Sequence, residues 1–227
     1  HYEVWSKNKV DSFYFPAAVA PDNVNVDNDK ILLWAKDESK PIEQYAYQMK
    51  HARNFMDRFE AANEAATNLK NPAAKAIIEA AIKDTFHVIR SIALTSYNPT
   101  AIDASMEAQI LELAAKDKVS SVREDAINVL SKINKPSFTP LYEKWVNDSS
   151  YTVAGAALAA LEIVDSAKAI DIAKAFSKQT LKKRLNTVVT TILTKYGDEQ
   201  MFDFVASTYG KLNIQSSEKF EMTMPFA

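Results

Sequence analysis

Three related stretches decide how this chain of 227 residues folds: KDTFHVIRSIAL (83–94), KDKVSSVREDAINVL (116–130) and NDSSYTVAGAALAAL (147–161). In each stretch an Asp ends one helix or enters a turn, and a short polar link and an apolar run follow it. The repeat is 33 and then 31 residues long, counted between Asp84, Asp117 and Asp148. A repeat of this length with two helical patterns is typical of stacked helical hairpins. It predicts an α-solenoid but no particular function.

The composition is that of an ordinary globular protein, with 47% hydrophobic and 25% charged residues. A chain of this length is sufficient for one large or two modest domains. The net charge of −2 and the pI of about 6.0 give no long-range attraction for nucleic acid, so we expect no nucleic-acid partner. The absence of cysteine excludes disulfides and thiolate metal sites. No apolar run approaches the roughly 18 residues of a membrane span.

Residues 1–40 differ in pattern from the rest of the chain. Short apolar and aromatic runs alternate there with turn residues such as Pro16, Pro21 and Asn28. This alternation predicts three or four short β-strands. So few strands do not easily close a core alone, and the chain begins inside one of them. We therefore expect it to be a fragment whose partner strands lie upstream.

From residue 41 to residue 227 the apolar residues follow the period of a helix. The pattern predicts eleven or twelve helices, and the short links between them predict antiparallel pairs. Several boundary residues support these helices: Pro41 in a first turn, Ser121 with Glu124 as a capping box, Thr139 as an N-cap before Pro140, and Gly197 just past a helix end. The predicted fold is therefore mainly α, an α-α superhelix preceded by a few strands.

The sequence shows no self-sufficient active site. Its three histidines, at positions 1, 51 and 87, form no H-E-x-x-H pair, so we expect no metal site, and His87 is interpreted as a packing or surface residue. The only glycines are Gly155, Gly197 and Gly210, which cannot form a phosphate-binding loop.

Two pairs of carboxylates and one basic run are candidate functional groups. Glu60 with Glu64, and Asp198 with Glu199, are imaginable as acid–base pairs, but helix-surface and N-cap roles explain them better. The run KQTLKKR (178–184) either contacts an acidic partner or forms a solvated face, and the solvated face is favoured.

Arg90 and Arg123 occupy the same place in two repeats, whereas the third repeat has Ala154 there. Repeated arginines in helical solenoids usually bond to carboxylates or carbonyls of the neighbouring repeat. We therefore predict a structural ladder that breaks at Ala154. The chain is expected to contain no catalytic, cofactor-binding or metal-binding residue.

Two overlapping segments, FYFPAAVAPDNVNVD (13–27) and PDNVNVDNDKILLWAKD (21–37), resemble the closing strands of the small β-sandwich in zinc aminopeptidases of the aminopeptidase N family, particularly the bacterial members. QMKHARNFMDRFEAANEAA (48–66) resembles the first helices of the domain that follows, and the repeated stretches resemble its HEAT-like helices. The resemblance implies two regions: 1–40 as the end of the sandwich and 41–227 as a HEAT-like superhelix.

The family's H-E-x-x-H zinc helix, downstream Glu, Gly-x-Met-Glu-Asn phrase and Tyr lie upstream of the sandwich, and none of them occurs in this sequence. The resemblance therefore implies a non-catalytic region of a zinc aminopeptidase that encloses the active-site chamber and restricts access to peptide N-termini. Its partners would be the catalytic domain of the same polypeptide, which would hold the zinc, and peptide substrates.

Two other functions stay open at this point. A free-standing HEAT-like scaffold for protein–protein interaction explains the helices but has no need of the β-segment at 1–40. A self-contained helical enzyme is a third possibility, although no constellation of residues supports it.

Overall fold

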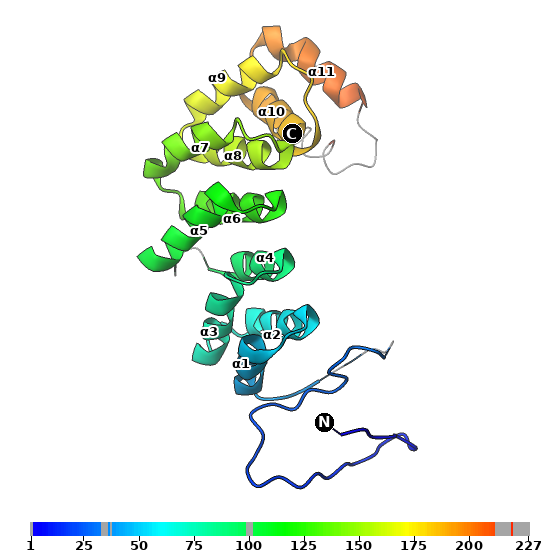
Figure 1. Cartoon of the computed structure of the whole chain (residues 1–227). Helices are drawn as coiled ribbons and strands as arrows, with labels where there is room; N and C mark the ends of the chain where they lie inside the picture. Colours follow the sequence, from blue (N-terminus) through cyan, green and yellow to red (C-terminus); the bar gives the residue numbers. More distant parts are fainter. Residues whose placement is uncertain (1, 33–35, 37, 99–101, 212–218, 220–227) are drawn as a thin grey trace. The chain divides into compact units, whose positions relative to one another are not determined.

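The computed structural model describes residues 2–32, 36, 38–98, 102–211 and 219. Within these residues the protein is mainly α, with eleven α-helices and no β-strand (Figure 1). The helices are α1 (Ile42–His51), α2 (Phe55–Thr67), α3 (Pro72–Ala81), α4 (His87–Ser96), α5 (Ala104–Lys116), α6 (Ser120–Ile133), α7 (Thr139–Trp145), α8 (Tyr151–Val164), α9 (Ser166–Phe176), α10 (Lys183–Tyr196) and α11 (Phe202–Lys211). Two 3₁₀ helices accompany them: η2 (Pro136–Phe138) and η3 (Glu199–Met201). The predicted helical class and number of helices are confirmed.

The chain divides into two compact units, residues 1–77 and 78–227. In the first unit the helical part begins at Ile42, and α1 packs against α2. Tyr45 and Met49 of α1 are buried, as are the alanines on one face of α2.

The strands predicted between residues 1 and 40 do not occur in the described part of that segment. Side-chain carboxylates here accept hydrogen bonds from backbone N–H groups that would donate to a neighbouring strand in a sheet. Asp11 accepts from the N–H groups of Lys7 and Asn8, and Asp27 accepts from those of Ile31 and Leu32. Such local bonds compete with strand pairing, and the described residues contain no neighbouring strand with which the segment could pair. Part of the prediction, at residues 33–35, lies outside the described residues.

In the second unit, α5 with α6, α7 with α8, and α9 with α10 form hairpins. Helix α4 and the second helices of these three hairpins also pack in series, α4 on α6, α6 on α8 and α8 on α10, and we call these four helices the second-helix row. Figure 1 shows α4, α6 and α8 one above the next. The row is therefore the continuous element of this unit.

Helix α8 lies at the centre of the unit and contacts α6, α7, α9 and α10. It is apolar almost all round, and eight of its fourteen residues are buried, as expected of a helix enclosed by neighbours. Gly155 lets α10 come close: a Cβ at this position would lie 2.8 Å from the backbone carbon of Arg184 and 2.8 Å from the nitrogen of Leu185.

The Asp of each repeated stretch orders the turn that enters a second helix. The carboxylates of Asp84, Asp117 and Asp148 accept backbone N–H bonds from the residue two positions on, at 2.8, 2.9 and 2.8 Å respectively. This local bond explains why an Asp recurs at the start of each repeat.

The predicted helix boundaries are only partly right. The capping box of Ser121 and Glu124 is wrong, because α6 begins at Ser120 without a side-chain cap and Glu124 bonds to another helix. Thr139 is the first residue of α7 and not its N-cap, because η2 precedes it directly. Pro41 is the N-cap residue of α1. Gly197 follows α10 as predicted, and its N–H donates to the carbonyl of Leu193.

Candidate interaction surface

The repeated arginines link successive repeats, as the sequence predicts. Arg90 of α4 donates through Nε and Nη2 to both carboxylate oxygens of Asp117, at 2.8 and 2.9 Å. Its Nη1 also donates to the carbonyls of Asp84 and Thr85. The guanidinium thereby ties its own turn to the turn of the next repeat.

The next repeat makes the same connection. Arg123 of α6 donates to the carbonyl of Asp117 at 2.9 Å and to the carboxylate of Asp148 at 3.0 and 3.2 Å. At Ala154, the equivalent position in α8, the series stops, as predicted. These residues are structural, and they fix the pitch of the second-helix row from α4 to α8.

A different bond connects α10 to α6. The guanidinium of Arg184 donates through Nη1 to Glu124 and through Nη2 to Oδ1 of Asn128, the latter at 3.0 Å. Since α8 lies between these two helices in the row, the bond spans one helix, over the small residue Gly155. The three polar side chains are only partly exposed, 30% for Arg184 and 22% for Glu124, and the bonds among them fix their directions.

Asp125, beside Glu124 on α6, completes a polar cluster on this row. Burial raises the pKa of Asp125, and the charge of Glu124 raises it further. A hydrogen bond with Ser91 of α4 and the charge of Arg184 act in the opposite direction. We call Ser91, Glu124, Asp125, Asn128 and Arg184 the polar cluster of the row. Residue spacing gave no sign of it, because its members come from three separate helices.

The basic run at residues 178–184 lies in the link from α9 to α10 and in the first turn of α10. Lys178, Lys182 and Lys183 are exposed, whereas Arg184 is turned into the polar cluster. The structure thus separates the run into three solvated cations and one anchored one.

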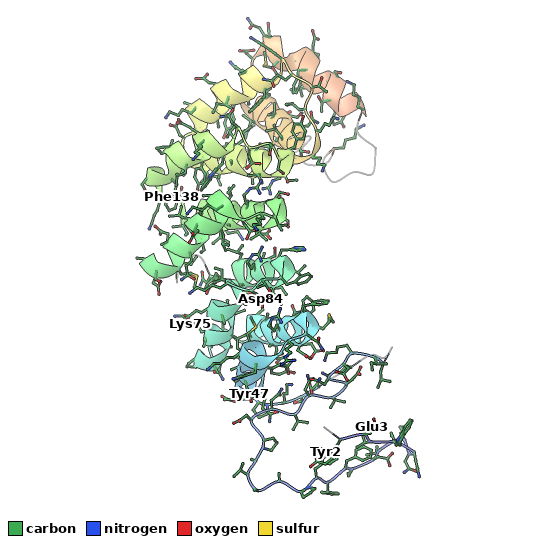
Figure 2. The ribbon with its side chains drawn as sticks, viewed as in Figure 1. Tyr2, Glu3, Tyr47, Lys75, Asp84 and Phe138 are labelled. Atoms are coloured by element: carbon green, nitrogen blue, oxygen red, sulfur yellow. The ribbon has the colours of Figure 1, made fainter. Side chains whose placement is uncertain are left out.

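The described N-terminal segment exposes an unusual amount of apolar surface. Twelve of the nineteen large apolar residues that are exposed in the described chain lie within residues 2–32. Figure 2 labels Tyr2 in this segment and shows its side chains projecting from a ribbon without helix or strand. Exposed apolar patches of this kind mark contact surfaces.

Residues 23–26 show how this segment is held. The amide of Asn25 donates to Asp57 of α2 at 2.9 Å, and the amide of Asn23 donates to Gln48 of α1 at 3.5 Å, so these two side chains face the helices of the first unit. Val24 and Val26 alternate with them and are 52% and 45% exposed. One face of the segment is therefore fixed by polar bonds, and its apolar face is open.

The other sequence candidates fall in separate places. His51 contacts the carbonyl of Tyr47 and stacks on its ring, and His87 begins α4 beside Phe86; His1 lies outside the described residues. Glu60 forms ion pairs with Lys30 and Lys36 of its own unit, and Glu64 is exposed on the surface of α2. No group of three metal-ligating side chains occurs in the described part of the chain.

Asp198 caps η3, as predicted, by accepting from the N–H of Gln200, and it pairs with Lys174 at 3.0 Å. Asp198 and Glu199 border a mainly apolar pocket of about 400 Å³, whose lining includes Leu193 and Val205. None of the described helices is both long and apolar enough to cross a bilayer.

Comparison with known proteins adds little to this geometry. No protein-family model matches the chain, and no curated protein matches it. Among solved structures, the chain is similar to AlkD2 from Streptococcus mutans, with a TM-score of 0.41 and 15% sequence identity over 82% of this chain and 97% of that one. A likeness this distant carries no argument about function, and the resemblance to zinc aminopeptidases stays a prediction.

Proposed function

We propose that this chain is a non-catalytic, HEAT-like scaffold that binds another polypeptide along its second-helix row. The polar cluster is the observation that supports the proposal. Glu124, Asn128 and Arg184 are partly exposed and fix one another's directions. Stacked helical repeats bind partners along extended faces, and binding is tightest when the contacting side chains are already ordered.

The rigidity of the row has its own source. The pairs Arg90–Asp117 and Arg123–Asp148 hold consecutive repeats at fixed spacing, and the Arg184 contacts hold α10 to α6. A partner would therefore meet a preformed face and would not have to order it.

The test is a selection of random dodecapeptides against the purified chain, followed by photo-crosslinking. A crosslinking residue at Asn128 reports on the row, and one at Lys144 on α7 is the matched control, because Lys144 is exposed outside the row. We expect crosslinks from position 128 and none from position 144. Equal crosslinking from both positions, or failure to select any peptide, would refute the proposal.

A second candidate is favoured by the exposed apolar side chains of residues 2–32. We propose, as this alternative, the non-catalytic C-terminal region of a zinc aminopeptidase, in which an upstream domain covers the apolar face of Val24 and Val26. The sequence resemblance and the need to cover apolar surface support it.

Peptide mapping of the native polypeptide, captured with an antibody against this chain, separates the two candidates. An upstream peptide containing H-E-x-x-H would establish the aminopeptidase and make its catalytic domain the partner. A native polypeptide without such a peptide would leave only the free-standing scaffold.

A further inference from the structure

The link between α9 and α10 is rich in positive charge. Four of the seven residues from 178 to 184 are cationic, and none is acidic. Lys178, Lys182 and Lys183 are exposed and form no ion pair with any residue that the structure describes. We call these three lysines together with Arg184 the basic link.

Nearby lysines of the same unit behave differently. Each of three is paired with an acid from another helix or turn: Lys168 with Glu143, Lys174 with Asp198, and Lys195 with Glu162. Among the described residues, the stack therefore supplies acids to the lysines around the basic link and to Arg184, but not to Lys178, Lys182 and Lys183.

Arg184 provides an observation independent of the lysines. Glu124 and Asn128 hold its guanidinium from α6, and its backbone is seated against Gly155 of α8. Arginine has five N–H donors, and these two contacts occupy two of them. An Arg oriented by other side chains suits recognition of a carboxylate, because little ordering is left to be done on binding.

Local stability does not explain the basic link. Cations are disfavoured at a helix N-terminus, yet α10 begins with Lys183 and Arg184 and has no acid in its first turn. Positions that break a local rule without a structural gain are where function is expected.

From these observations we infer that the basic link is a docking surface for an acidic segment of a polypeptide. The inference rests on the proposed scaffold function and names its class of partner: a segment rich in Asp or Glu that meets the three lysines and extends toward Arg184. A nucleic acid fits less well, because the whole chain carries a net charge of −2 and only four cations are grouped here.

The test measures binding of fluorescein-labelled decaglutamate to the full chain by fluorescence anisotropy. The variant Lys178→Gln/Lys182→Gln/Lys183→Gln removes the exposed charges of the basic link. The control Lys118→Gln/Lys132→Gln/Lys144→Gln removes the same charge from exposed lysines elsewhere in the unit. Circular dichroism checks that both variants keep the parent's helix content and melting temperature.

We expect the parent to bind decaglutamate. Because several charges meet in the contact, its affinity should fall by roughly tenfold or more between 50 and 200 mM salt. The basic-link variant should lose about tenfold or more, and the control should stay within about twofold. Equal losses in both variants, or no binding by the parent, would overturn the inference. Tighter binding of a 20-base-pair DNA duplex than of decaglutamate would also overturn it.

The inference and the proposed function fail in different ways. If decaglutamate does not bind while selected dodecapeptides still crosslink at position 128, only the acidic partner is wrong. If no peptide of either kind binds, the scaffold function falls as well.

Discussion

Arg90 and Asp117 form a two-pronged ion pair between consecutive repeats, with Nε 2.8 Å from Oδ2 and Nη2 2.9 Å from Oδ1. The side chains are 13% and 5% exposed, so water screens the pair weakly. The same carboxylate orders the turn before α6 through the N–H of Val119. The carboxylate of Asp117 thus both links the two repeats and stabilises the turn that precedes α6.

We expect Asp117→Asn to destabilise the protein by about 2 kcal/mol, because it removes one charged acceptor and leaves the Arg90 guanidinium partly unpaired. Asp148→Asn is the matched control at the equivalent place, where the pair with Arg123 is more exposed, at 16% and 20%. The loss of stability caused by Asp148→Asn should be about half as large as that caused by Asp117→Asn. Urea unfolding measures both, and a greater loss at position 148 would contradict the burial argument.

Replacement of the two helical glycines of the second unit by alanine should change the stability of the protein in opposite directions. Gly155→Ala places a methyl group 2.8 Å from the backbone of α10, so we expect a loss of about 1–3 kcal/mol despite the better helix propensity of alanine. Gly210→Ala meets nothing within 4 Å inside α11 and should gain up to about 1 kcal/mol. Thermal melting compares them, and shifts of the same sign would show that α10 is free to move away.

Much of the helical part could be predicted from the sequence because the interactions that specify it join residues close together in the chain. The Asp of each repeat bonds two residues on, and Arg90 and Arg123 contact the repeat that follows, so a repeat of about thirty residues is enough to infer the ladder. Gly197 is recognisable for the same reason, since a helix end is specified within a few residues.

The errors concern partners that are distant in sequence. Glu124 has the spacing of a capping residue, but its partner is Arg184, sixty positions later. The β-pattern of residues 1–40 describes side chains suited to a sheet, yet strand formation depends on neighbouring strands that the described residues do not supply. The basic run 178–184 was visible in the sequence, but only the structure separates its solvated lysines from its anchored arginine.

Tyr142 should tolerate loss of its hydroxyl group. The residue is fully buried in α7, and its hydroxyl has no hydrogen-bond partner among the described residues. Burial accordingly raises the pKa of Tyr142. A buried hydroxyl without a partner costs free energy, so Tyr142→Phe should be neutral or stabilising by up to about 1 kcal/mol.

The control Tyr142→Leu keeps the apolar character but removes the ring, which lies edge-on to Phe138 at 6.3 Å between centroids. We expect it to destabilise the protein by about 1 kcal/mol or more through lost packing. Urea unfolding distinguishes the two substitutions. A clear loss of stability in Tyr142→Phe would mean that the hydroxyl has a partner after all.

Asp125 should give the polar cluster a measurable dependence on pH. Its pKa is raised, chiefly by burial, so between the ordinary value of about 3.9 and the raised value the folded protein binds more protons than the unfolded chain. Stability contributed by this group is therefore present below the ordinary pKa and is lost as pH rises through the raised pKa. We expect the stability of the parent relative to Asp125→Asn to fall with rising pH across that window and to be constant above it.

Asp198 supplies a control of opposite sign. The hydrogen bond from Lys174 lowers the pKa of Asp198, so its contribution is present above the ordinary pKa and is lost as pH falls through the lowered one. Relative to Asp198→Asn, the parent should therefore gain stability as pH rises. Urea unfolding of both variants and the parent at a series of pH values from about 2 to 7 gives both slopes. Slopes of the same sign would refute the burial of Asp125 as the cause, because an effect of overall charge acts on both sites alike.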